Sequence, residues 1–98
     1  MQRFMCLHTV PPGVITVDQM CQLMEAGQHD SVIRGYRNFI NLSAGKAVCI
    51  IEAPDAESIA NWFQSMNLPY DSITLVEWEG DRGEVHDVRL VAAGQSHN

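Results

Sequence analysis

Residues 47–53 read AVCIIEA, and residues 54–63 continue directly as PDAESIANWF. The first segment is apolar on both of its alternating faces until Glu52, which predicts a strand that is buried on both sides of a sheet. Pro54 ends this strand, and Asp55 is a favourable residue to cap the first amides of a following helix. That helix is predicted by apolar residues that recur at helical spacing, namely Ile59, Trp62, Phe63 and Met66.

Further strands and one further helix are predicted on both sides of this segment. Residues 2–10 favour a strand that stops at Pro11. Thr16 suits the N-cap of a helix and Gln19 suits its capping-box partner, and apolar periodicity carries that helix to about Ile33. The other elements that we expect are a strand at 36–42, a turn at 43–46, a strand at 73–78, a turn-rich connector at 79–84 and a short strand at 85–91.

The expected order of elements is β-α-β-β-α-β, the signature of the ferredoxin-like split βαβ fold of the α+β class. Right-handed crossovers then place both helices on one face of an antiparallel four-stranded sheet. We expect one domain over residues 1–93, with a C-terminal extension from about residue 80, and a flexible tail over 94–98. The second face of the sheet is left uncovered although residues 47–51 are apolar on both sides, so we expect a homodimer that packs sheet to sheet.

Composition excludes several classes of function. The 98 residues carry a net charge of −6, and the six Lys and Arg residues are scattered, which argues against nucleic acid or an anionic membrane as a partner. Apolar runs are too short to span a membrane, and the first residues lack the apolar stretch of a signal peptide, so we expect a cytoplasmic protein. Three cysteines without CxxC spacing predict reduced thiols, with one thiolate as a metal ligand as the alternative.

A family resemblance rests on CIIEAPDAE at residues 49–57, Leu-Pro at 68–69 and Asp-Ser-Ile at 71–73. With these motifs, roughly residues 3–79 resemble the small bacterial nickel-binding ferredoxin-like proteins, formerly a domain of unknown function, of the dimeric α/β-barrel superfamily. The resemblance implies a homodimer with facing sheets and nickel as the bound metal. It also implies a cofactor-free enzyme as an alternative, because other dimeric α/β barrels include isomerases, monooxygenases and dehydratases.

Two positions depart from the pattern of this family. Histidines of the pattern match Asn38 and Trp62 here. An indole has no accepting nitrogen, and an amide oxygen is a poor ligand for nickel, so neither residue replaces an imidazole. We therefore expect no tight nickel site.

Five residues are candidates for a ligand pocket between the sheet and the helices: His8, Tyr36, Asn38, Glu52 and Trp62. Tyr36 and Asn38 are expected on one strand face, and Trp62 is either a core residue or the wall of a cavity. His8 is either a buried histidine bonded to backbone, or a pocket residue and candidate metal ligand. Glu52 either reaches solvent at the strand end or serves as a pocket acid.

Two classes of function remain open at this point. The first is a protein that binds a small molecule or a metal ion in the pocket. The second is the cofactor-free enzyme, in which His8 would act as a proton shuttle. Spacing alone identifies no catalytic residue, because the sequence has no nucleophile elbow, phosphate loop or dinucleotide fingerprint.

Overall fold

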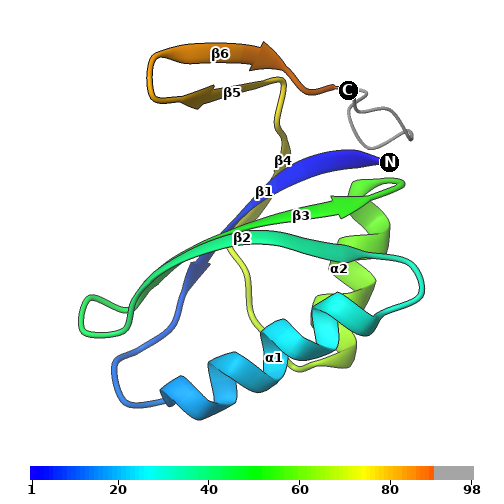
Figure 1. Ribbon diagram of the computed structural model, residues 1–98. Coiled ribbons are helices and arrows are strands. Elements are labelled where there is room, and N and C mark those ends of the chain that lie inside the picture. Colours follow the sequence, from blue (N-terminus) through cyan, green and yellow to red (C-terminus); the bar gives the residue numbers. More distant parts are fainter. Residues whose placement is uncertain (90–98) are drawn as a thin grey trace.

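The computed structural model describes residues 1–89, which form a four-stranded antiparallel sheet, two helices and a separate hairpin (Figure 1). The order of the main sheet is β2-β3-β1-β4. Its strands and helices are β1 (Gln2–Thr9), α1 (Val17–His29), β2 (Arg34–Asn41), β3 (Lys46–Ala53), α2 (Ala56–Ser65) and β4 (Ser72–Leu75). This order confirms the α+β prediction and is consistent with a ferredoxin-like fold. The tail expected at 94–98 and the end of the strand expected at 85–91 lie outside the described residues.

The pairing of β1 with β3 sorts the side chains of both strands between two faces. Cys6 lies opposite Cys49, and both are buried in the core beside the helices. The same face buries Phe4, Ile51 and Ala53. The intervening side chains point to the opposite face and are exposed or half-buried: Met5, Leu7, Val48 and Ile50. Strand β3 is therefore apolar on both faces, as its sequence predicts.

Both predicted helix starts are confirmed. Thr16 Oγ1 accepts from the backbone N–H of Gln19, and Gln19 Oε1 accepts from the backbone N–H of Thr16, which completes the capping box of α1. The carboxylate of Asp55 accepts from the backbone N–H of Ser58 and caps α2. Among residues 1–89, no helix has the length and apolar content that a membrane crossing requires.

The prediction that the first helix runs to about Ile33 is wrong, because α1 ends at His29. Asp30 leaves the helical conformation, and its carboxylate accepts from the backbone N–H groups of Val32 and Ile33 at 2.8 and 2.9 Å. An Asp side chain that competes for backbone amides in this way replaces helical hydrogen bonds and turns the chain. Ile33 consequently enters the core directly before β2.

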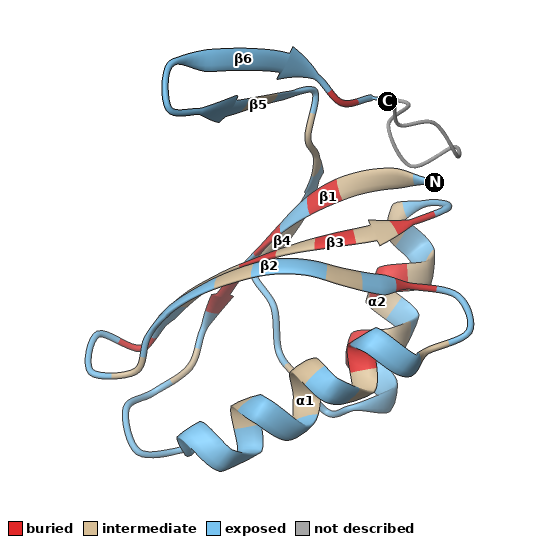
Figure 2. Cartoon of the chain, in the orientation of Figure 1, coloured by how far each residue is buried: buried red, intermediate tan, exposed pale blue. Residues whose placement is uncertain are grey.

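The strand predicted at 73–78 is divided in the structure. β4 ends at Leu75, and Trp78 begins β5 (Trp78–Asp81), which pairs with β6 (Glu84–Asp87) in its own two-stranded sheet. Arg82 and Gly83 have positive φ angles of 53° and 90°, as a tight two-residue hairpin turn requires. The expected connector is thus the tip of a hairpin, which lies on the side of the main sheet away from the helices (Figure 1) and is largely exposed (Figure 2).

A pair of glycine substitutions tests the turn between β2 and β3. Gly45 has a φ of +71°, and a Cβ there would lie 2.4 Å from the carbonyl oxygen of Val10, whereas Gly13 has a φ of +86° and open space around it. We expect Gly13→Ala to lower the free energy of unfolding by about 1 kcal/mol, the cost of left-handed backbone alone. Gly45→Ala should lower it clearly more, because the Val10 backbone must also move. Urea denaturation measures both losses, and equal losses would contradict this steric role.

Candidate functional site

A cavity of about 70 Å³ lies between α1, the helix-covered face of the sheet and α2. Its wall is mostly apolar and includes Met20, Met24, Ile40, Ile51, Trp62 and Phe63. At roughly 10–15 Å³ for each water-sized group, this space holds about five non-hydrogen atoms. It therefore suits a very small molecule or the buried end of a larger one.

His8, on the wall of this cavity, carries a buried polar atom that has no hydrogen-bond partner in the described part of the chain. The residue is 3% exposed, and its ring meets the ring of Phe63 edge-on, with 4.9 Å between the centroids. Its Nδ1 lies 2.8 Å from the carbonyl oxygen of Pro69, and because a carbonyl only accepts, Nδ1 carries the proton. In the neutral ring Nε2 then presents a lone pair, and among residues 1–89 no hydrogen-bond partner satisfies this buried atom. Such an orphaned acceptor costs about 1–3 kcal/mol, which a bound donor would offset.

Two cysteine thiols in this region are held in the protonated form. Asn38 lies opposite Cys49 in the β2–β3 pair, and both residues line the cavity. Burial raises the pKa of the Cys49 thiol, and a hydrogen bond from Asn38 opposes that rise only in part. Burial, assisted by the nearby Cys49, raises the pKa of Cys6 to about 12. Because the thiolate is the reactive and metal-binding form, both side chains act here as apolar packing.

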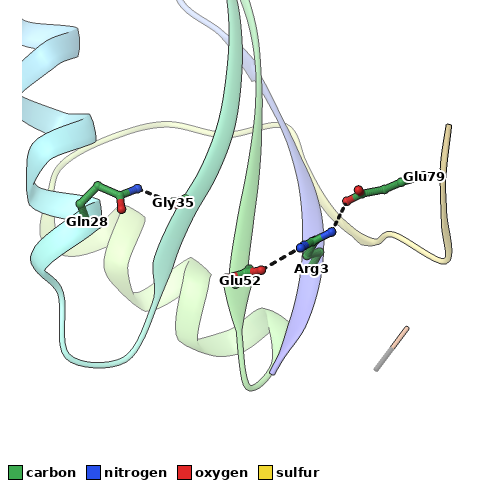
Figure 3. A network of polar contacts seen from close by, with 5 residues as sticks. All are labelled: Arg3, Gln28, Gly35, Glu52 and Glu79. Atoms are coloured by element: carbon green, nitrogen blue, oxygen red, sulfur yellow. Dashed lines mark hydrogen bonds and ion pairs between the residues drawn. The ribbon is translucent and has the colours of Figure 1, made fainter. Parts of the chain in front are cut away.

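The helix α1 is held to the rest of the molecule near its C-terminal end. Gly27 is the buried residue of α1 and faces the Trp62 ring. Gln28 Nε2 donates to the carbonyl oxygen of Gly35 at 2.6 Å (Figure 3). The apolar residues of the preceding turns, including Met20 and Met24, are only partly buried. Methionine side chains adapt to irregular spaces, so this side of the cavity can adjust to the shape of a ligand.

The structure divides the five candidate residues between the two faces of the sheet. His8, Asn38 and Trp62 line the cavity. Glu52 is on the opposite face, where its carboxylate accepts from Arg3 Nε at 3.0 Å (Figure 3). Tyr36 lies there too, with its ring 3.9 Å from the Arg3 guanidinium carbon.

The prediction that Tyr36 shares a face with Asn38 is wrong because of a β-bulge. Gly35 pairs with Ile51, but Arg37 pairs with Ile50, so Tyr36 is an extra residue on β2. A bulge changes the alternation of faces along its strand. A single glycine within a predicted strand is a known signal of such a bulge, and Gly35 offered that signal in the sequence.

Sequence reasoning did not single out Arg3, which lies at the centre of a polar cluster on the open side of the sheet. Arg3 Nη1 donates to Glu79 at 2.9 Å while its Nε donates to Glu52 (Figure 3). Partial burial lowers the pKa of the guanidinium, but the bonds to both carboxylates outweigh it and the net effect is a raised pKa. The available signal was the alternation of β1, which places Arg3 on the same face as Met5 and Leu7.

His8 does not belong to a metal-binding cluster. Within residues 1–89, no three His, Cys, Asp or Glu side chains gather in a way that could hold a metal ion. The imidazole Nε2 is a possible single donor, and the neighbouring Cys49 thiol is held protonated by burial. The arrangement is chemically suited to accept one hydrogen bond inside an apolar cavity.

Comparison with known proteins gives one family match. A family model described as the SCO4226-like nickel responsive protein family matches residues 4–76. No curated protein and no solved structure matches the chain. The matched range includes both helices and the main sheet except the first two residues of β1.

Thiol labelling tests the burial of the cavity wall. Cys21 on α1 is exposed, whereas Cys6 and Cys49 are buried with raised pKa values. We expect a disulfide-exchange reagent at neutral pH to modify one thiol rapidly in the native protein and all three after denaturation. The Cys21→Ser variant should show almost no rapid reaction. Rapid modification of two thiols in native Cys21→Ser would show that the cavity is more open than described.

Proposed function

The chain belongs to the SCO4226-like nickel responsive protein family, and we propose that it binds a small, neutral, mostly apolar organic molecule with one hydrogen-bond donor. The observation that carries this proposal is that His8 lines an apolar cavity and that its buried Nε2 has no hydrogen-bond partner among residues 1–89. Ligand sites are commonly apolar with a few fixed polar groups that orient the ligand. Here the bond from Nδ1 to the Pro69 carbonyl fixes the ring, so Nε2 is a preorganised acceptor.

Charge at the cavity favours a neutral ligand. Lys46 is the cationic residue on the wall, but its ammonium donates to Thr9 Oγ1 at 3.1 Å on the exposed surface. The lone pair on Nε2 attracts an N–H or O–H group and repels a carboxylate. A neutral alcohol or N–H heterocycle meets both conditions, because it supplies the donor and buries apolar surface.

Nickel does not fit the residues of this cavity. Tight binding needs several imidazole or thiolate donors around one ion. His8 supplies one such nitrogen, while Asn38 contributes an amide and Trp62 an indole that has no lone pair to offer. Two copies of His8 cannot share an ion across a sheet-to-sheet interface, since His8 lies on the helix-covered face.

The enzymatic alternative uses the same atom, with Nε2 of His8 as a general base. Proton transfer chemistry of this kind is usually assisted by a second acid or base within reach of the substrate. Among the described residues no carboxylate lines the cavity, and the Cys49 thiol is held in its protonated form by burial. Binding therefore accounts for the observed groups with fewer requirements than catalysis does.

A pair of five-atom rings tests the acceptor directly. Pyrrole and furan are nearly equal in size and fit the cavity volume, but only pyrrole has an N–H donor. We expect millimolar binding of pyrrole, consistent with the limit for so few atoms, and about tenfold weaker binding of furan because Nε2 stays unsatisfied. Chemical-shift titration of the ¹⁵N-labelled protein measures both affinities and locates the ligand by shifts around His8 and Trp62.

Variants separate the hydrogen bond from simple filling of the cavity. His8→Phe should abolish the preference for pyrrole, whereas His29→Phe at an exposed histidine of α1 should keep it. Equal binding of the two rings by the wild type would refute the role of His8. Shifts confined to the open face of the sheet would refute the cavity as the site.

Nickel titration provides a second test. We expect calorimetry of the untagged chain to show no stoichiometric nickel binding at sub-micromolar affinity, because the described residues offer no cluster of metal ligands. The double variant Asn38→His/Trp62→His places two imidazoles on the wall beside His8, and we expect it to bind nickel more tightly than the wild type. Tight wild-type binding that is lost in His8→Ala would contradict the apolar-ligand proposal.

A further inference from the structure

The sheet face opposite the helices, here called the open face, carries a contiguous apolar patch. Its members are Met5, Leu7, Phe39, Val48 and Ile50. They are cross-strand neighbours, since Met5 pairs with Ile50 while Leu7 and Phe39 both pair with Val48. Phe39 is 61% exposed. An uncovered apolar patch of this kind on a sheet is typical of an interaction surface.

The hairpin of β5 and β6, here called the arm, also exposes apolar side chains. Backbone bonds from Val76 to Arg3 and from Val88 to Glu77, each 2.9 Å, join its base to the main sheet and close it. Trp78 and Val85 on the arm are 56% and 65% exposed. A two-stranded hairpin is marginally stable by itself in water, so these apolar side chains favour docking on another surface.

The arm and β2 carry opposite charge. Residues 77–87 include five acids and one base: Glu77, Glu79, Asp81, Glu84, Asp87 and Arg82. Exposed β2 carries Arg34 and Arg37, and among the described residues neither takes part in an ion pair. Glu79, Glu84 and Asp87 are paired within the subunit with Arg3, His86 and Arg89. Among the described residues Glu77 and Asp81 take part in no ion pair, and β2 has guanidinium groups that lack carboxylates. This complementarity lies within one sequence, which favours a second copy of the same chain as the partner.

Sheet topology keeps these two surfaces apart within one copy. The arm follows β4 at one edge of the main sheet, and β2 forms the other edge. Within its own chain the arm reaches Arg3 on β1 through Glu79, and β2 lies two strands farther, at about 10 Å. Arg34 and Arg37 are therefore beyond the contacts that the arm makes in its own subunit.

A twofold axis parallel to the strands brings the two surfaces together. If two open faces pack against each other around such an axis, the β4 edge of one sheet lies over the β2 edge of the other. Rotation about this axis does not change the position of a residue along the strand direction, so residues at the same height in the two sheets face each other. The register places Arg34 level with Glu52 and Arg3, which is also the level at which the arm joins the sheet.

We propose that, in the sheet-to-sheet homodimer that the family resemblance implies, the acidic arm of each copy docks on the basic edge strand β2 of the other. In this arrangement carboxylates of the arm face Arg34 and Arg37 of the partner subunit, and the contact occurs twice by symmetry. The proposal does not depend on the ligand of the cavity, which lies on the other face of the sheet.

The area of the open face explains why the arms are needed. Three strands of eight residues and one of four, at 4.8 Å spacing and 3.3 Å per residue, cover roughly 440 Å² on each copy, or roughly 900 Å² for the pair. Stable specific interfaces usually bury about 1,200–2,000 Å² in total. The sheets alone fall short of this range, and two docked arms bring the interface into it.

Charge exchange between two variants tests the docking of the arm. Arg34→Glu/Arg37→Glu reverses the charge of β2, and Asp81→Arg/Glu84→Arg reverses the charge at the tip of the arm. We expect the wild type to sediment as a dimer of twice the 10.9 kDa chain mass at micromolar concentration. Each variant alone should dimerise about tenfold more weakly or worse, since repulsion replaces attraction twice per dimer. An equimolar mixture should recover the wild-type dimer, because each reversed arm then meets a reversed β2.

Matched controls keep this test decisive. Asp18→Arg/Glu25→Arg on α1 changes the net charge by the same amount as the arm variant and should leave the dimer intact. Phe39→Glu should give a folded monomer, because Phe39 is exposed in the single chain and its loss disturbs only the interface. Circular dichroism and thermal melts verify that each variant is folded.

Three results would overturn the proposal. A wild-type monomer at micromolar concentration would exclude the dimer, and a dimer that survives Phe39→Glu would exclude the open face. Charge variants that dimerise like the wild type, or whose mixture fails to recover dimerisation, would exclude the placement of the arm on β2.

Discussion

The register of β1 on β3 determines what each face of this molecule can do. Eight consecutive pairs run from Gln2 with Ala53 to Thr9 with Lys46, and both strands are central in the sheet. A shift of one residue would exchange the faces of the whole strand, so that Leu7 would face the helices and His8 the open side. Burial of Phe4 and its inward neighbours fixes this register, because the alternative exposes them. The cavity and the open face are two consequences of one pattern of alternation.

Local signals in the sequence were sufficient for the order of the elements. Thr16 with Gln19 and Asp55 cap their helices through bonds that span only three residues, so their sequence spacing carries the information. The end of α1 and the bulge at Tyr36 were not predicted, because both depend on competition between alternative backbone hydrogen bonds. In the first case the Asp30 carboxylate accepts from the backbone N–H groups of Val32 and Ile33, and the helix ends. In the second the pairing with β3 decides how Gly35 is accommodated.

The candidate site was predictable as a set of residue types but not as an arrangement. Alternation placed His8 on one face of a central strand, and helical spacing placed Trp62 toward the sheet. The orphaned state of Nε2, however, follows from a bond between Nδ1 and Pro69, which is 61 residues away in the sequence. Periodicity also cannot show that Arg3 would attract Glu52 and Glu79 to the other face, since these partners come from β3 and the arm.

The positions Asn38 and Trp62 are both engaged in contacts of their own. Each side chain makes packing contacts that an imidazole would not reproduce. Trp62 packs against Phe63 with 5.8 Å between the ring centroids and faces Gly27 of α1, so its large ring fills the space where the two helices approach the sheet. Asn38 lies opposite Cys49 on the cavity wall, where it partly opposes the rise that burial causes in the pKa of the Cys49 thiol. With these two positions committed to packing, the wall retains His8 as one fixed acceptor, and the chemistry that one acceptor serves best in an apolar cavity is recognition of one donor.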